Sequence, residues 1–210
     1  MLQHTRIHLA SRSPRRRELL TQIGVHFDTI VFRNPPRDDR ELDETPLDGE
    51  APVAYVQRIA RIKAEYGWRI VGWRKLLTQP VLAADTTIEL AGAIIGKPFS
   101  QEDAERILRL LSGQTHRVHT AVTVCFQDRT ESVLSTSEVR FCVLDDAAIR
   151  RYVATGEPMD KAGAYGIQGH AGAFVEHLSG SYTGVMGLPL FETAQLLKRF
   201  DCHPQGICGA

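Results

Sequence analysis

Apolar and polar residues follow two different periods along this chain, and these periods separate strands from helices. Short apolar runs and apolar–polar alternation predict strands at 7–10, 27–32, 80–84, 87–90, 93–95, 118–126 and 133–141. Apolar residues spaced three and four apart predict helices at 14–24, 52–66, 100–111, 145–153 and 189–200. Because strands and helices alternate while the two long strands follow each other directly, we expect an α/β fold with a mixed, twisted sheet and flanking helices.

Local signals mark the ends of several of these elements. Ser13 and Ser100 are predicted N-caps, because a serine hydroxyl can accept a hydrogen bond from the first turn of a helix. Gly67 is expected to close the second helix, and Ala91-Gly92 resembles the turn of a hairpin. The Pro- and acid-rich segment 33–50 is expected to be an exposed, mobile loop.

Composition narrows the class of protein. The 210 residues fit one domain over 1–200, with two lobes around a central cleft and a flexible tail at 201–210. The 25 Lys and Arg residues balance 25 Asp and Glu residues, which argues against a general nucleic-acid binder. Four scattered cysteines, a charged N-terminal stretch and no run of 18 apolar residues lead us to expect a soluble, cytoplasmic protein without a membrane partner.

Three arginines stand in the first turn of the first helix, in the run Ser13-Pro14-Arg15-Arg16-Arg17. Cations at this end oppose the helix dipole at a cost of roughly 0.3–1 kcal/mol each. The helix start also offers free N–H groups, so this turn is consistent with an anion-binding site. An exposed basic patch explains the same run equally well.

Three further residues allow either a chemical or a purely structural interpretation. Asp85 is expected at the carboxyl end of the strand 80–84, where it can hold a divalent metal, accept a proton from water or simply cap a turn. Lys63 lies on the apolar side of the second helix, where a lysine must extend to solvent or meet an anion. Lys97 stands in the tight loop Gly96-Lys97-Pro98, although most lysines in such loops are simply exposed.

Residues 156–169, the glycine-rich segment, contain four glycines and several charges. Glycines let a backbone approach a ligand closely, but the segment contains neither the phosphate-binding GxxxxGK[ST] loop nor GxGxxG after a strand. His116 and His119 are three residues apart on a strand, which places them on opposite faces and argues against a shared metal.

Taken in order, these segments resemble the Maf family of nucleotide pyrophosphatases from Leu9 to about Leu197. The matching pieces are Leu9-Ala10-Ser11-Arg12-Ser13-Pro14-Arg15-Arg16, Ala84-Asp85-Thr86, Gly96-Lys97-Pro98, Leu111-Ser112-Gly113-Gln114-Thr115-His116, Thr120-Ala121-Val122, the glycine-rich segment and Gly187-Leu188-Pro189-Leu190. The run 160–169 is similar to the branch of the family that acts on dTTP and UTP. Arg12 departs from the pattern, because a small residue is usual at that position.

The resemblance implies hydrolysis of a nucleoside triphosphate to a monophosphate and pyrophosphate with Mg²⁺ or Mn²⁺, by a homodimer with the Maf and ITPase type of fold. It implies a catalytic role for Asp85, Lys97 and Lys63, and metal binding by Glu44 and Asp85. The substrate-binding residues that it implies are Ser13, Arg15, Arg16, Thr86, Lys161 and Gln168. Whether Asp85 is the metal ligand or the base is left open. Two alternatives are a house-cleaning pyrophosphatase for modified nucleotides and a cell-division (septum) regulator that acts by binding.

Overall fold

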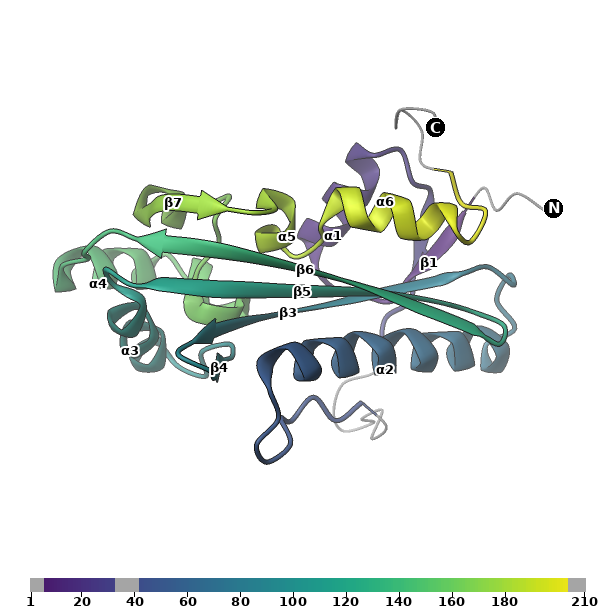
Figure 1. Cartoon of the computed structure of the whole chain (residues 1–210), viewed down its shortest axis with the longest axis horizontal. Helices are drawn as coiled ribbons and strands as arrows, with labels where there is room; N and C mark the ends of the chain where they lie inside the picture. The colour runs from purple at the N-terminus through teal and green to yellow at the C-terminus, as the bar shows by residue number, and fades with distance from the viewer. Residues whose placement is uncertain (1–5, 33–41, 204–210) are drawn as a thin grey trace.

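A seven-stranded mixed sheet organises the computed structural model, which describes residues 6–32 and 42–203 (Figure 1). The strands run in the order β2-β1-β3-β5-β6-β7, and β4 pairs with β3 off this path. Strand β1 is parallel to β2 and β3, whereas all other pairs are antiparallel, as expected for a mixed sheet. The strands are β1 (Ile7–Leu9), β2 (Phe27–Thr29), β3 (Val81–Leu90), β4 (Ala93–Ile95), β5 (Thr115–Phe126), β6 (Arg129–Phe141) and β7 (Val175–Ser179).

The three long strands β3, β5 and β6 connect two differently covered halves of the molecule (Figure 1). In one half, α2 covers one face of the sheet while α1 and α6 lie on the other, and α3 and α4 lie in the other half. The helices are α1 (Pro14–Gln22), α2 (Pro52–Trp73), α3 (Gln101–Leu111), α4 (Asp146–Ala154), α5 (Tyr182–Met186) and α6 (Leu190–Lys198). Separate buried clusters form under α3 and α4, under α1 and α6, and under α2, which agrees with a two-lobed fold.

Strand β3 corrects the expected position of Asp85. The sequence predicted one strand that ends at residue 84 and a second one at 87–90, but β3 is continuous over Val81–Leu90. Its pairing with β5 is unbroken from Val81 to Glu89, so cross-strand hydrogen bonds override the weak strand preference of Asp85. Asp85 therefore lies in the middle of a strand, where the two halves of the molecule meet.

Helix α2 corrects the expected role of Gly67. The helix continues through this glycine to Trp73 instead of ending there. A Cβ at position 67 would lie only 2.8 Å from Val81 Cγ1 and 3.1 Å from Ala10 Cβ. The glycine therefore permits close packing of the helix on the sheet, which offsets its low helix propensity.

Other local signals are confirmed. The hydroxyls of Ser13 and Ser100 cap α1 and α3, and Ala91 and Gly92 have the positive φ angles of a tight hairpin turn. Helix α5 and strand β7 were missed in the sequence, and the second strand ends at Thr29 rather than 32. Within the described part of the chain, no helix is long and apolar enough to span a membrane.

Parts of the predicted loop and tail lie outside the described residues. Residues 42–50 are mostly exposed and lack regular structure, as predicted, whereas 33–41 and most of the tail lie outside the described residues. Cys125, Cys142 and Cys202 are free thiols, and Cys208 lies in the part that is not described.

Candidate active site

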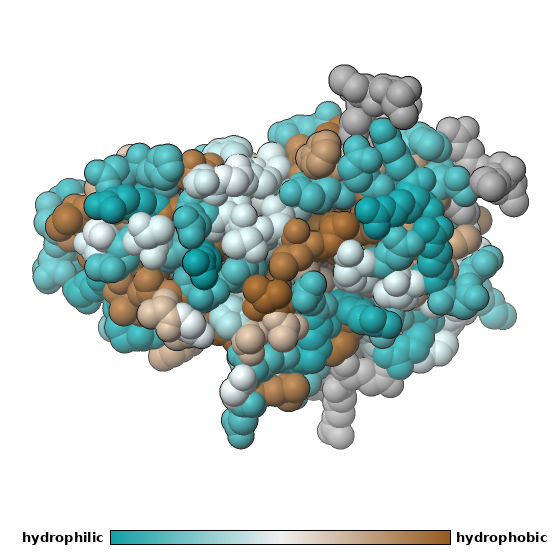
Figure 2. All heavy atoms as spheres, viewed as in Figure 1, coloured by the Kyte–Doolittle hydropathy of each residue, from teal (hydrophilic) through white to brown (hydrophobic). Residues whose placement is uncertain are grey.

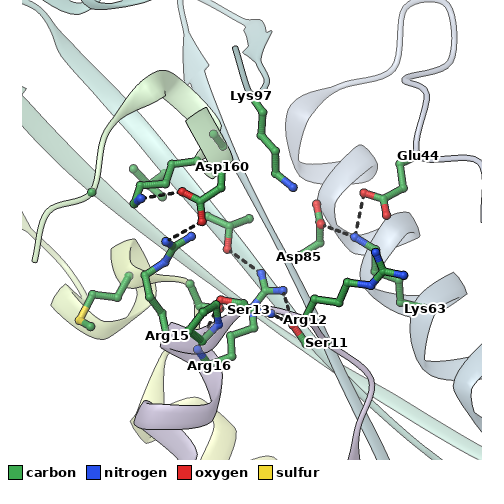
Figure 3. A pocket seen from close by; sticks show the side chains of 18 of the residues that line it. Ser11, Arg12, Ser13, Arg15, Arg16, Glu44, Lys63, Asp85, Lys97 and Asp160 are labelled. Carbon is green, nitrogen blue, oxygen red and sulfur yellow. Dashed lines mark hydrogen bonds and ion pairs between the residues drawn. The ribbon is translucent and has the colours of Figure 1, made fainter. Parts of the chain in front are cut away.

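A cavity of about 680 Å³ lies at the junction of the two halves. Its lining comes from the β1–α1 turn, the middle of β3, helix α2, the loop after β4 and the glycine-rich segment (Figure 3). All ten residues that the resemblance implied contribute to it: Ser13, Arg15, Arg16, Glu44, Lys63, Asp85, Thr86, Lys97, Lys161 and Gln168. Segments that are more than 150 residues apart in sequence therefore meet around one cavity.

The β1–α1 turn presents two arginines to this cavity. Pro14 occupies the first position of α1 and Ser13 caps the helix, so the side chain of Ser13 accepts from the backbone N–H of Arg16 at 3.5 Å. Arg15 extends toward the glycine-rich segment, where its Nη1 lies 3.4 Å from Asp160 Oδ2. Arg17 does not line the cavity, so only part of the arginine run forms the site.

Arg16 is held by three neutral oxygens. Its Nε donates to Gly187 O at 2.8 Å, while Nη1 and Nη2 donate to Ser11 Oγ and Thr86 Oγ1, both at 3.3 Å. Burial lowers the pKa of the Arg16 guanidinium, whereas the negative charge of Asp85 acts in the opposite direction. A shielded cation bonded only to neutral groups favours the approach of an anionic ligand.

Asp85 and Glu44 converge on one amine. Lys63 Nζ, from α2, lies 2.9 Å from Asp85 Oδ1 and 2.9 Å from Glu44 Oε2 (Figure 3). The side chains of Lys63 and Asp85 are only 13% and 12% exposed, whereas that of Glu44 is 50% exposed. Lys63 therefore pairs with carboxylates of the protein itself instead of extending to solvent, which decides between the two interpretations that the sequence left open.

Lys97 approaches the same region from the loop after β4. Its ammonium points into the cavity toward Asp85, as Figure 3 shows. The loop is fixed because Gly96 O accepts a hydrogen bond of 2.9 Å from the backbone N–H of Gly163. Arg15, Arg16, Lys63, Asp85 and Lys97 together form what is called here the charged wall of the cavity.

The glycine-rich segment forms another wall of the cavity and contains two short 3₁₀ turns, Glu157–Asp160 and Ala162–Ala164. Gly163 has a φ of +70°, and a Cβ there would lie 2.2 Å from Ile88 Cδ1. A Cβ at Gly169 would lie 2.3 Å from Glu157 Oε1. The glycines are therefore required by backbone conformation and close contact, a role that composition alone could not distinguish from ligand approach.

Glu157 joins the two ends of this segment. Its Oε1 accepts from Tyr152 Oη at 2.9 Å, and Oε2 accepts from the backbone N–H of His170 at 3.2 Å. The carbonyl of Glu157 accepts from Lys161 Nζ at 2.5 Å, and Lys161 Nζ also contacts Asp160 Oδ1 at 2.6 Å. These bonds fix the backbone of the segment from which Lys161 and Gln168 reach the cavity.

The cavity floor is apolar and is supported by a buried histidine. Ile88, Val118 and Tyr165 line this floor. Tyr165 Oη lies 2.8 Å from His116 Nε2, and burial lowers the pKa of His116 to about 4. His119 Nε2 instead lies 2.7 Å from Glu89 Oε2, so the two histidines belong to separate clusters, as their spacing predicted.

The donor set fits a divalent cation that is bound together with phosphate. Among residues 6–32 and 42–203, no group of three or more His, Cys, Asp or Glu side chains could hold a metal. Mg²⁺, however, is usually held by one or two carboxylates together with substrate phosphates. Asp85 and Glu44 supply two carboxylates that converge on one point, so they would hold such an ion once a ligand supplies further oxygens.

Sequence reasoning assigned no role to several residues that line the cavity. Ser11 and Asp160 stand beside assigned residues, and each contacts an arginine of the β1–α1 turn. Arg12, the departure from the family pattern, donates to the carbonyl of Phe32 and also lines the cavity. Tyr165 appeared in the sequence only within the glycine-rich segment, and its contact with His116 could not be predicted because the two residues are 49 positions apart.

The fold and the site define an α/β protein in which four cationic side chains surround a buried carboxylate in one cavity. The chain belongs to the Maf family, because the family model described as "Maf-like protein" matches residues 6–200.

Several relatives are similar over nearly their whole length. A protein of Dechloromonas aromatica named dTTP/UTP pyrophosphatase is 64% identical over 95% of this chain and 99% of its own. Proteins of the same name from Aromatoleum aromaticum and Ralstonia nicotianae are 62% and 54% identical, each over 93% of this chain and over 95% and 94% of their own lengths. Among solved structures, the Staphylococcus aureus Ham1 protein is 19% identical, with a TM-score of 0.44 over 65% of this chain and 71% of its own.

Proposed function

We propose that this protein hydrolyses dTTP and UTP to the nucleoside monophosphate and pyrophosphate with the help of a divalent cation. Three relatives that bear this activity in their name are 54–64% identical over more than nine tenths of the chain. The observation that carries the proposal is the charged wall, where four cationic side chains surround one buried carboxylate in a single cavity.

The cationic side chains match the charge of a triphosphate. Arg15 and Arg16 lie at the start of α1, where the positive end of the helix dipole adds to their attraction for a phosphate. Lys63 and Lys97 reach the cavity from α2 and from the loop after β4. Fixed donors of this kind stabilise the charge that develops on phosphate oxygens during the reaction.

In the proposed reaction, a water oxygen attacks the α-phosphorus and the bond between this phosphorus and the α–β bridging oxygen breaks. The bridging oxygen leaves with the pyrophosphate, and the water proton passes to whichever of the Asp85 and Glu44 carboxylates the cation leaves free, with Asp85 the more buried of the two. A bound divalent cation would neutralise phosphate charge and polarise the phosphoryl oxygen. Lys97 would stabilise the departing pyrophosphate, and the direction of its ammonium into the cavity supports this role.

The glycine-rich segment is the proposed site of base selection. Gln168 is an exposed side chain that lines the cavity, and its amide offers both a donor and an acceptor to a pyrimidine. Tyr165, Ile88 and Val118 supply an apolar surface for the planar base next to it. Thr86 acts through Arg16, because its hydroxyl bonds Arg16 Nη2 and Thr120 Oγ1.

The test is a panel of the eight common nucleoside triphosphates with Mg²⁺, in which the products are separated by ion exchange. UMP and dTMP together with pyrophosphate are the expected products. Diphosphate with orthophosphate would contradict the proposed bond cleavage. If none of the eight is hydrolysed, methylated pyrimidine triphosphates should be assayed next. Hydrolysis of these alone would favour the house-cleaning alternative.

A homodimer and a cytoplasmic location remain predictions. An apolar strip lies between α6 and α2 on the face shown in Figure 2, and it is bordered by polar residues. Exposed apolar strips of this kind are typical of protein interfaces, which supports the proposed dimer. Light scattering coupled to size exclusion should give about twice the monomer mass of 23.4 kDa.

A further inference from the structure

We propose that Lys63 is the internal counter-ion of the metal-binding carboxylates in the nucleotide-free protein, so that the divalent cation is admitted only when a nucleotide draws this lysine away. The inference rests on the proposed function, and it adds an order of binding to it. One ammonium nitrogen lies 2.9 Å from Asp85 Oδ1 and 2.9 Å from Glu44 Oε2. Figure 3 shows this ammonium between the two carboxylates.

The ion pair with Asp85 is shielded from water. Both side chains of the pair are about one-eighth exposed, so solvent screens their attraction less than that of a surface pair. Removing a single partner from a shielded pair leaves a charge without compensation, which is strongly unfavourable. A free metal ion must therefore displace a favourable contact before it can bind either carboxylate.

No other cation of the described residues bonds these carboxylates. The hydrogen bonds and ion pairs of the Asp85 and Glu44 carboxylates lead only to Lys63. Lys97 points into the same cavity but makes no ion pair with either group. Removing Lys63 should therefore leave two carboxylates without their ion-pair partner, whereas removing Lys97 should leave the ion pairs in place.

A nucleotide provides the exchange that releases the carboxylates. The ammonium of lysine is a compact cation on a flexible four-carbon stem, so it can turn from carboxylate oxygens to phosphate oxygens within the same cavity. The phosphates also supply the additional oxygen ligands that two carboxylates lack. Binding of nucleotide and binding of metal are then coupled through one side chain.

The test measures Mn²⁺ binding without nucleotide, by electron paramagnetic resonance of the free ion. Lys63→Met should bind Mn²⁺ at least about ten-fold more tightly than the wild type, which corresponds to the loss of about 1.4 kcal/mol of competing interaction. Lys97→Met is the matched control, because it removes the same charge from the same cavity and should stay near the wild-type affinity. Lys63→Gln gives a second, polar replacement in case the methionine variant folds poorly.

The double variant Lys63→Met/Asp85→Asn tests whether the gain in Mn²⁺ affinity depends on the Asp85 carboxylate. Loss of the additional affinity in this variant would assign the gain to the carboxylates, as we expect. Equal affinities of Lys63→Met and Lys97→Met, or a gain that persists without Asp85, would overturn the inference. Because no nucleotide is present, failure to hydrolyse UTP or dTTP would contradict the proposed function while leaving this result unaffected.

Discussion

The charged wall and the glycine-rich segment face the same cavity, but they are built in different ways. Most of the charged wall stands on regular elements, with Asp85 in the middle of β3 and Lys63 on α2. The glycine-rich segment has two short 3₁₀ turns, and its shape depends on Gly163, Gly169 and the carboxylate of Glu157. The first wall is defined by its side-chain charges, and the second by its backbone path.

In the proposed function, this difference separates two tasks of one site. Charges that are fixed on a strand and on helices keep their positions while bonds change, as phosphoryl chemistry requires. A wall of turns can vary its shape without disturbing these charges, as discrimination between bases requires. Changes in the charged wall should therefore lower turnover, and changes in the glycine-rich segment should alter selectivity or stability.

The largest effect is expected for Asp85→Asn, which keeps the shape of the side chain but removes its charge. Turnover should fall by about 10³-fold, within the range of general acid–base catalysis. Steady-state kinetics on UTP measure the loss, and circular dichroism should show an unchanged fold. A turnover within a few-fold of the wild type would show that another group accepts the proton.

Gly163→Ala should destabilise the protein more than any other change in the glycine-rich segment. Its Cβ would meet Ile88 Cδ1 at 2.2 Å in addition to the positive φ, which should lower the free energy of unfolding by about 2–4 kcal/mol. Gly156→Ala is the matched control, because Gly156 has a φ of +75° and nothing within 4 Å of a Cβ. Urea denaturation of both variants measures the difference, and equal losses would refute the steric account.

Gln168→Ala should change selectivity rather than turnover. We expect the ratio of kcat/KM for UTP to that for ATP to fall about ten-fold, as is typical when one base-directed contact is lost. The kcat for UTP should change less than this ratio. An unchanged ratio would mean that the base is recognised elsewhere in the cavity.

The last effect concerns stability and involves His116, whose pKa burial lowers from 6.5 to about 4. The unfolded chain takes up this proton first, so the stability that neutral His116 contributes is present above pH 6.5 and is lost as the pH falls through about 4. The difference in unfolding free energy between wild type and His116→Gln should therefore shrink by at most about 1.4 kcal/mol per pH unit in this window. A difference that stays constant with pH would contradict the buried, neutral state.

Several features of the fold could be predicted from local signals in the sequence. The serine caps, the hairpin turn at Ala91-Gly92 and the buried face of α3 depend on neighbours within a few residues, so they could be predicted. The residues of the charged wall were singled out by their positions in the predicted elements, but their roles were implied only by the family resemblance. Each of them alone also had a purely structural interpretation.

The errors have one physical cause, which is long-range contact. Asp85-Thr86-Thr87 suggested a break in the strand, but pairing with β5 keeps β3 continuous. Gly67 suggested a helix end, but its close approach to Val81 explains the glycine within a continuous α2. The role of Glu157 depends on His170 and Tyr152 in the folded chain, and no sequence pattern records those bonds.

Hydrolysis of UTP in water enriched with ¹⁸O tests the central claim most directly, because the position of the label identifies the phosphorus that is attacked. Attack on the α-phosphorus next to the charged wall predicts one ¹⁸O atom in UMP and none in pyrophosphate, as read by mass spectrometry. Label in pyrophosphate would show attack on the β-phosphorus, and it would contradict the proposed placement of the triphosphate against Asp85.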